Sequence, residues 1–343
     1  MAKSEIAKSE KRKANSDKVL VTGANGLLGA NIVRELVHRG YDVRILARET
    51  SDLSGIEGVD FDRENGDILD QESVNKAVEG CDFVIHSAAN TSQWPTTYSH
   101  YEPVNVHGTL HVIEAVKRHR VKRFVFVSSA NAFGNGTKEK PGTELSEFNG
   151  FRIGSGYMIS KFVAQQFVLS EVEKSDIPAI VVNPTFMIGP YDSKPSSGRI
   201  ILMGMGKKVQ VSPPGGKNFI HVRDAAIGTC NALTMGRIGE CYLLANENLT
   251  YKDFFGILNT VTGEKPVSLG LPGLLLKSIG MGGTIVEKLL QRPAPLSLVN
   301  ARLLCLENYY SGKKAVEALE LPQTPIETAI REAIGWFKAN GKM

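Results

Sequence analysis

The feature that most constrains this chain is a glycine-rich turn between an apolar run and a helical pattern. Residues 18–22 (KVLVT) predict a buried parallel strand, and apolar residues follow with helical spacing from 27 to 39. Glycines at such a junction let the backbone approach a pyrophosphate, which the N–H groups at the helix start then bind. The turn therefore predicts a dinucleotide site, the alternative being a glycine-rich turn that binds nothing. The residues expected to contact the cofactor here are Gly23, Asn25, Gly26, Leu27, Leu28 and Gly29.

The strand and helix patterns continue to alternate along the chain. Further strands are expected at 43–47, 83–86, 124–128, 180–183 and 241–244, and helices at 73–79, 104–118 and 156–173. This alternation predicts an α/β fold, a doubly wound Rossmann sheet that is parallel and covered on both faces. We expect a mobile tail over 1–17 and a Rossmann domain over 18–185 plus about 217–246. A smaller, mostly helical substrate lobe would take about 186–216 plus 247–343.

Charge and cysteine usage exclude several classes of protein. The net charge is +4, and residues 1–17 carry two of these charges, so no nucleic-acid partner is expected. The Lys11–Lys13 cluster fits a solvated tail better than a targeting patch. Four scattered cysteines, Cys81, Cys230, Cys241 and Cys305, favour a reducing, cytoplasmic setting. Charges interrupt the apolar stretch 269–290, which predicts an amphipathic helix pair and no membrane partner.

The end of the second expected strand bears on cofactor choice. An acidic residue about twenty positions after the glycines would favour NAD, but Arg48 lies there and suits the 2′-phosphate of NADP. NADP(H) is therefore favoured over NAD(H), although Arg48 could instead be a surface residue paired with Glu49. Asp67 is placed to accept from the adenine amine, and Asp70 fits a helix N-cap.

Several motifs in order resemble one family. They are TGANGLLG, Gly66-Asp67, HSAA at 86–89, Asn105 in NVHGT, VSS at 127–129, YMISK at 157–161 and NPTFMIGP from 183. From Lys18 to about Lys338 the chain resembles the extended short-chain dehydrogenases/reductases, especially the dihydroflavonol-4-reductase-like group with its hopanoid-associated sugar-epimerase-type members. The resemblance implies further cofactor contacts from Ile68, Ser87, Ala88, Ala89, Val127, Ser128, Asn183, Pro184 and Phe186.

The resemblance also implies a proton-transfer site. Tyr157 would be the general acid/base, Lys161 would lower its pKa and hold the nicotinamide ribose, and Ser129 would orient the substrate oxygen. Asn105 would fix Lys161 or the ribose through a water, or be an ordinary helix-interior asparagine. The same Tyr-x-x-x-Lys spacing recurs at Tyr309–Lys313 and Tyr310–Lys314, where it does not lie on the expected helix.

Three functions compete at this point. The first is an NADP-dependent reductase or dehydrogenase acting on a carbonyl/alcohol substrate, the second a nucleotide-sugar epimerase, and the third a non-catalytic cofactor sensor. The triad weighs against the sensor, and Lys217, where sugar-nucleotide enzymes tend to carry an arginine, favours the reductase. An apolar pocket wall is expected, although inter-lobe packing is an alternative use of these side chains. Its members would be Thr91, Trp94, Phe133, Met187 and Tyr191.

Other polar residues are assigned no chemistry. No metal site is expected, because His107 and His111 share a helix face without a third ligand in view. His221 and Asp224 would position the second lobe. The resemblance implies a homodimer formed through the helices at Val104 and Gly156.

Overall fold

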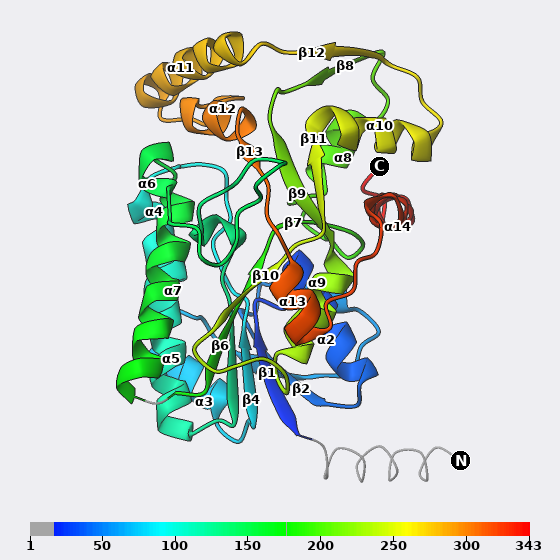
Figure 1. Cartoon of the computed structure of the whole chain (residues 1–343). Helices are drawn as coiled ribbons and strands as arrows, with labels where there is room; N and C mark the ends of the chain where they lie inside the picture. Colours follow the sequence, from blue (N-terminus) through cyan, green and yellow to red (C-terminus); the bar gives the residue numbers. More distant parts are fainter. Residues whose placement is uncertain (1–16, 176) are drawn as a thin grey trace, which may run out of the picture.

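A computed structural model describes residues 17–175 and 177–343. A parallel sheet runs through the centre of the molecule (Figure 1). Over these residues its strand order is β10-β6-β5-β4-β1-β2-β3, with every neighbouring pair parallel. The strands are β1 (Lys18–Thr22), β2 (Asp42–Ala47), β3 (Asp62–Asn65), β4 (Phe83–His86), β5 (Arg123–Val127), β6 (Ala179–Pro184) and β10 (Cys241–Leu244). The predicted doubly wound α/β fold is confirmed. Only β3 escaped prediction, because its DREN sequence is polar and mostly exposed.

Helices cover both faces of this sheet because its strands are apolar on both sides. Val19 and Val21 of β1 pack in one core, and Leu20 between them packs in the other. The first core adjoins α2 (Leu27–His38), α9 (Val222–Asn231) and α13 (Lys313–Leu319). The second adjoins α3 (Gln71–Val78), α5 (Gly108–His119) and α7 (Gly156–Ser175).

The helix expected over 104–118 is part of a longer, interrupted one. It starts as α4 (Tyr98–Glu102), passes through a π-helical turn, η2 (Pro103–His107), and continues as α5. The N–H of Gly108 donates to the carbonyl of Pro103, five residues back, which defines the π turn. Such turns re-aim side chains, and here Asn105 becomes almost completely buried.

The smaller lobe contains more strand than the sequence suggested. Over the described residues, β9 (Gly216–His221) pairs with β7 (Phe186–Ile188), β11 (Glu247–Thr250) and β13 (Glu307–Asn308), and β8 (Val209–Ser212) pairs with β12 (Val267–Gly270). Its helices are α8 (Arg199–Gly204), α10 (Tyr251–Thr262), α11 (Gly273–Leu290), α12 (Leu298–Leu304) and α14 (Ile326–Ala339). Three short helices complete the described chain: η1 (Ser54–Ile56), η3 (Ala130–Ala132) and α6 (Gly150–Ile153). The lobe borders stay a prediction, and the pairing of β9 joins the two predicted units.

Contacts from the C-terminal segment tie the lobes together. The Asp224 carboxylate accepts from the N–H and hydroxyl of Thr324 at 2.7 and 2.9 Å, and His221 Nε2 lies 3.2 Å from Glu332 on α14. Both side chains therefore position the C-terminal segment, as the sequence predicted. Of the predicted tail, only Asp17 lies within the described residues, and it pairs with Lys122 at 2.7 Å.

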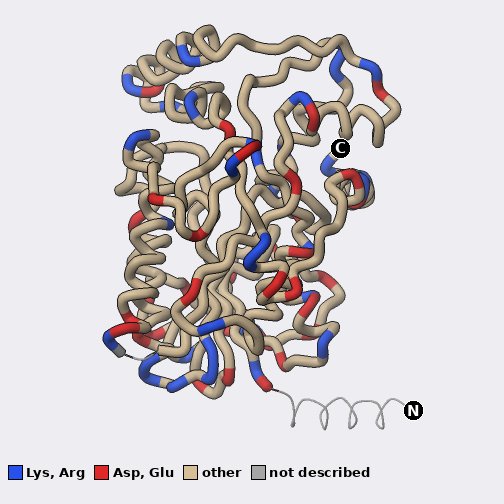
Figure 2. Tube along the Cα trace, in the orientation of Figure 1, with Lys and Arg blue, Asp and Glu red and all other residues tan. Residues whose placement is uncertain are grey.

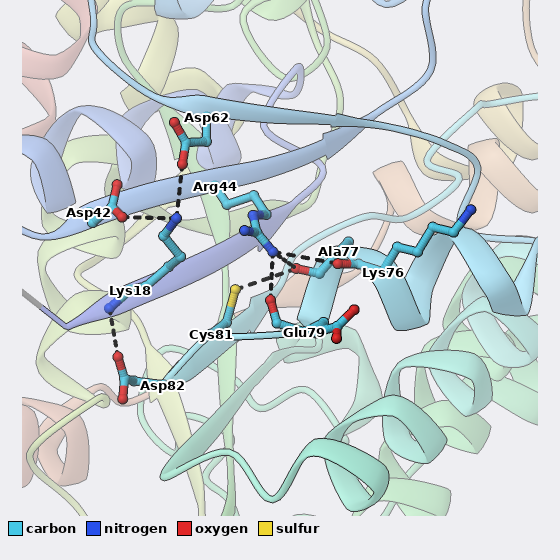
Figure 3. A network of polar contacts seen from close by, with 9 residues as sticks. All are labelled: Lys18, Asp42, Arg44, Asp62, Lys76, Ala77, Glu79, Cys81 and Asp82. Atoms are coloured by element: carbon cyan, nitrogen blue, oxygen red, sulfur yellow. Dashed lines mark hydrogen bonds and ion pairs between the residues drawn. The ribbon is translucent and has the colours of Figure 1, made fainter. Parts of the chain in front are cut away.

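A charged network closes the amino-terminal edge of the sheet (Figure 3). Lys18 Nζ lies 2.9 Å from Asp62 and 3.0 Å from Asp42, which joins β1, β2 and β3. Arg44 donates to the carbonyls of Lys76, Ala77 and Glu79 at the end of α3, at 3.5, 3.1 and 2.7 Å. These carbonyls have no intrahelical partner, so the guanidinium caps the helix. The opposite, carboxyl edge is thereby left for the functional site.

Candidate active site

The glycine turn after β1 is held by close backbone packing. Gly23 has φ +74°, and a Cβ on it would lie 2.6 Å from the nitrogen of Ala88. A Cβ on Gly29 would lie 2.1 Å from the carbonyl oxygen of Gly23. These two glycines are therefore required by the fold itself, which brings the end of β4 and the start of α2 against the turn.

Gly26 is different, and it indicates a ligand. Its φ is −96°, and a Cβ there would meet nothing closer than the Gly23 oxygen at 3.4 Å, an ordinary contact. The chain's own atoms thus do not require glycine at this exposed N-cap of α2, whereas an anion seated against the helix start would. Across the carboxyl edge, the buried hydroxyl of Ser128 has no hydrogen-bond partner among the described residues. Both observations fit a dinucleotide laid along this edge.

The serine and tyrosine of the predicted triad lie together. Ser129 follows β5 and Tyr157 is in the first turn of α7, and their side chains interact. The Ser129 hydroxyl accepts from the N–H of Asn131 at 3.2 Å, so its proton is free to point at the phenol. Burial raises the pKa of Tyr157 above its ordinary value, and the neighbouring Ser129 hydroxyl opposes this only in part. The phenol is therefore protonated at neutral pH.

Lys161 lies one helical turn further along α7, and its amine bonds the chain's own backbone. Its Nζ donates to the carbonyl of Val127 at 2.8 Å and lies 4.7 Å from the ring centre of Phe126. Only 2% of the residue is exposed, and this burial lowers its pKa to about 7. Burial is thus the largest influence on the pKa of both side chains.

A buried polar chain connects the glycine turn to the triad helix. His86 Nδ1 lies 2.7 Å from Thr22 Oγ1, and its Nε2 lies 3.1 Å from Thr109 Oγ1. Because Thr109 donates to the carbonyl of Asn105 at 2.8 Å, its oxygen accepts from Nε2, which leaves Nδ1 to accept from Thr22. Burial, and secondarily Lys161, lowers the pKa of His86 to about 3, so the ring is neutral. Motif matching had assigned this histidine no role.

Two of the predicted asparagines bond within the chain. Asn105 donates to Ser160 Oγ at 2.9 Å and accepts from the backbone N–H of Asn90 at 2.7 Å, so it fixes the residue beside Lys161. Asn183, expected at the cofactor, is completely buried, and its amide donates to the Ser129 carbonyl at 2.9 Å and to Gln165 at 2.7 Å. The structure thus corrects the role of the Asn183 side chain from cofactor contact to support of Ser129.

The predicted phosphate-reading arginine has an unexpected neighbourhood. Arg48 is 67% exposed and pairs with Asp67, at 4.0 Å, and not with Glu49. Arg63 on β3, which sequence reasoning missed, donates to the Arg48 carbonyl at 2.8 Å. The side chains of Arg48 and Arg63 therefore lie together at the carboxyl edge of the sheet, beside the ends of β2 and β3. Asp70 caps α3 by accepting from the Ser73 N–H at 3.2 Å, as expected of an N-cap.

The other predicted cofactor contacts surround this edge. Ser87 donates to the Thr22 carbonyl at 2.7 Å, and the N–H of Ala88 donates to the Thr22 hydroxyl at 3.2 Å. The Ile68 carbonyl binds His111 at 3.0 Å, so its backbone is already engaged. The remaining ones lie at strand or helix ends: Asn25, Leu27 and Leu28 at the start of α2, Ala89 after β4, Val127 ending β5, and Pro184 and Phe186 at the β6–β7 junction.

The predicted pocket wall is only partly assembled at the tyrosine. Thr91 and Trp94 lie on the loop after β4, whereas Phe133 packs in the sheet core and Met187 against the opposite core. Tyr191 is wrong as a wall residue, since its ring lies under Arg34 of α2 and against Trp336 of α14. The structure instead supplies Tyr101, whose ring centre lies 5.9 Å from that of Tyr157.

The recurrent Tyr-x-x-x-Lys spacings have other uses. Tyr309 and Tyr310 are buried, and Lys314 pairs with Glu240. Across residues 17–175 and 177–343, no group of three or more His, Cys, Asp or Glu side chains could hold a metal. In the same ranges, no helix has the length and apolar character needed to cross a bilayer.

Comparison with known proteins identifies the family. The model of the NAD dependent epimerase/dehydratase family matches residues 19–245. The chain is 30% identical to a putative dihydroflavonol 4-reductase of Synechocystis sp. over 96% of both chains. It is also 30% identical to sterol demethylase protein B of Methylococcus capsulatus, over 94% of this chain and 98% of that one. The crystal structure of gox2253 superposes with a TM-score of 0.83 at 30% identity, covering 96% and 100% of the two chains. The chain therefore belongs to the NAD-dependent epimerase/dehydratase family and is an NAD(P)-binding oxidoreductase of the extended short-chain dehydrogenase/reductase type.

Proposed function

We propose that this protein reduces the carbonyl group of an apolar substrate with NADPH, using Tyr157 as the proton donor. The observation that carries the proposal is the pairing of the Ser129 and Tyr157 side chains at the carboxyl edge of the sheet, beside the glycine turn. A phenol whose pKa burial raises is a protonated acid at neutral pH, which suits the direction of carbonyl reduction.

Each of the chain's own groups then has a definite task. The nicotinamide, when bound, supplies the hydride that the carbonyl carbon receives. The alkoxide left on oxygen takes the phenolic proton of Tyr157, while the Ser129 hydroxyl donates a hydrogen bond that orients that oxygen. Lys161 holds a proton near neutral pH, and a cofactor ribose in place of the Val127 carbonyl would be its partner.

The preference for NADP(H) is supported by the two arginines at the end of β2 and β3. The exposed guanidinium of Arg48 suits a 2′-phosphate, and Arg63 braces its backbone. Replacing Arg48 with Asp should weaken NADPH binding at least tenfold and shift preference toward NADH. Replacing the exposed Lys252 with Asp is the control. Unchanged cofactor preference would show that Arg48 does not read the phosphate.

Relatives favour a reductase over an epimerase. The similar proteins are named a dihydroflavonol 4-reductase and a sterol demethylase protein, and both names refer to ring compounds other than nucleotide sugars. One observation supports the epimerase alternative. Lys217 lies 4.9 Å from the ring centre of Phe186, burial lowers its pKa to about 8, and no carboxylate in the described chain lies within ion-pair distance. The diphosphate of a sugar nucleotide would supply the anionic partner that the Lys217 amine lacks.

A spectrophotometric assay separates these functions. The purified protein is titrated with NADPH and NADH, and NADPH oxidation is followed with aromatic and alicyclic aldehydes and ketones. We expect turnover with at least one carbonyl compound and tighter binding of NADPH than of NADH. Inversion of a nucleotide sugar without net NADPH oxidation would establish the epimerase, and cofactor binding with neither reaction would establish the sensor.

We also propose a homodimer formed through α5 and α7. These long helices lie side by side on one flank of the molecule (Figure 1), and Phe167 on α7 is 40% exposed. Size-exclusion chromatography with light scattering tests this, since Phe167→Glu should give a monomer. The four cysteines are free, which suits the reducing, cytoplasmic setting proposed from the sequence.

A further inference from the structure

Helix α11 of the smaller lobe presents its large apolar side chains outward. Leu274 is 81% exposed, Leu289 76% and Leu290 62%, and further apolar residues of the helix are about half exposed. With 3.6 residues per turn, the exposed apolar residues occupy about half of the helix circumference. They include Leu274, Ile279, Met281, Ile285, Leu289 and Leu290.

The buried side of the same helix carries its small residues. A Cβ on Gly280 would lie 2.6 Å from the Ala301 side chain of α12, and one on Gly283 would lie 1.9 Å from the carbonyl oxygen of Leu296, just before α12. An ordinary surface helix buries its large apolar residues and exposes small or polar ones. Because α11 does the reverse, packing within the lobe does not account for its apolar face.

The neighbouring two-stranded sheet repeats this inversion. Val209 pairs with Val267 and Val211 with Leu269, and all four side chains are 46–61% exposed. The alternate residue Gln210 is buried instead and bonds Asn259 at 2.9 Å. β12 leads directly into α11, and Figure 1 shows β8, β12 and α11 along one end of the molecule, remote from the start of β1. A continuous apolar end results, which we call the apolar cap: β8, β12 and α11.

The charge around the apolar cap is strongly positive. Residues 205–212 and 264–302 contain seven Lys or Arg, all exposed, and two acidic residues, giving +5 in a chain whose net charge is +4. Both acids are engaged locally, since Glu264 accepts from the Gly206 N–H and Glu287 from the Ala294 N–H. Figure 2 shows Lys and Arg along this end of the tube.

The lysines of α11 stand at one edge of its apolar face. Lys277 and Lys288 are eleven residues apart, about three helical turns, so they lie in one line along the helix. A helix with an apolar face bordered by lysines is typical of segments that lie in the lipid headgroup region. A second copy of the chain is disfavoured as the occupant, because two positively charged ends, each with +5 over residues 205–212 and 264–302, would face each other.

We propose that the apolar cap docks on the surface of an anionic phospholipid bilayer. The apolar side chains of α11, β8 and β12 would enter the headgroup region, and the surrounding Lys and Arg would bind lipid phosphates. This docking needs no spanning helix, so it revises the expectation of no membrane partner without contradicting the absence of a long apolar run. α12 contacts α6, which lies just before the helix of Tyr157, so the bilayer would lie on the triad's side of the lobe.

Vesicle co-sedimentation of the full chain tests this without using enzymatic activity, so its result is independent of the proposed function. Vesicles of phosphatidylcholine with phosphatidylglycerol should bind the protein, and vesicles of phosphatidylcholine alone should bind it less. High salt should weaken the binding. The double variant Lys277→Gln/Lys288→Gln should lower partitioning about 30-fold, at about 1 kcal/mol per charge.

A matched pair of variants distinguishes docking through the apolar cap from nonspecific adsorption to vesicles. Leu289→Asp should lower binding at least tenfold, whereas Leu145→Asp, at a 93% exposed leucine outside the apolar cap, should leave it unchanged. Equal binding of both variants, or no binding of the unaltered chain to either vesicle, would overturn the proposal. So would a concentration-dependent oligomer that Leu289→Asp dissolves while vesicle binding is absent, since the cap would then join two copies.

Discussion

Replacing Lys161 with Met should make the protein more stable near neutral pH. The lysine is 2% exposed, and in the described chain its amine has one hydrogen-bond acceptor, the Val127 carbonyl, and no carboxylate within ion-pair distance. Burial lowers its pKa from 10.5 to about 7. Folding below that pH must therefore bury a charge, and this cost is tolerated where the amine is needed for function.

The sign and size follow from proton linkage. Between pH 7 and pH 10.5 the unfolded chain keeps the Lys161 proton that the folded chain has released, so this residue makes stability rise with pH. Each pH unit corresponds to about 1.4 kcal/mol, so Lys161 costs about 4 kcal/mol at pH 7 and about 2 at pH 9. Met removes this cost but leaves the Val127 carbonyl without a donor, at about 2 kcal/mol. The net gain is about 2 kcal/mol at pH 7 and about zero at pH 9.

Urea unfolding at pH 7 and pH 9, without added nucleotide, measures this difference. The unaltered chain and Lys161→Met should differ most at pH 7, and the exposed Lys252→Met should follow the unaltered chain at both values. A Lys161→Met variant that is destabilised equally at pH 7 and pH 9 would show that the amine is not desolvated, and the account of the site would need to change.

Two further predictions concern the fold around the site. Gly26→Ala should unfold at the same temperature as the unaltered chain yet bind NADPH at least tenfold more weakly. Gly29→Ala should instead lower the melting temperature, because its Cβ would meet the Gly23 oxygen. A Gly26→Ala protein with intact NADPH affinity would contradict the binding of the pyrophosphate against Gly26. Arg44→Met should cost about 1–3 kcal/mol in urea unfolding by removing the cap of α3, and Arg44→Lys should cost less; no loss in either would show the cap to be unimportant.

The sequence was sufficient for the parts of the fold that hydrophobic runs define. β1 and β4 start and end at the expected residues, since their short apolar stretches are bounded by turns and buried on both faces. β3 was missed because it is an edge strand with a polar sequence. In the smaller lobe, β9 forms part of a sheet through residues up to 91 positions away, and no local pattern indicates such pairing.

The sequence predicted which residues form the site better than it predicted the contacts that these residues make. Motif order selected Ser129 and Tyr157, which the fold brings together from β5 and α7. It did not show that Asn183 turns away to support Ser129, because that depends on Gln165 across the core. Nor did it show Tyr191 packed on Arg34, since helix α14 closes over that ring from the far end of the chain.

The most direct test of the central claim is Tyr157→Phe, assayed for NADPH binding and for carbonyl reduction in the same preparation. The account predicts that affinity for NADPH stays within about twofold while turnover falls by at least a thousandfold, because only the proton-donating hydroxyl is lost. Retained turnover in the phenylalanine variant would contradict it.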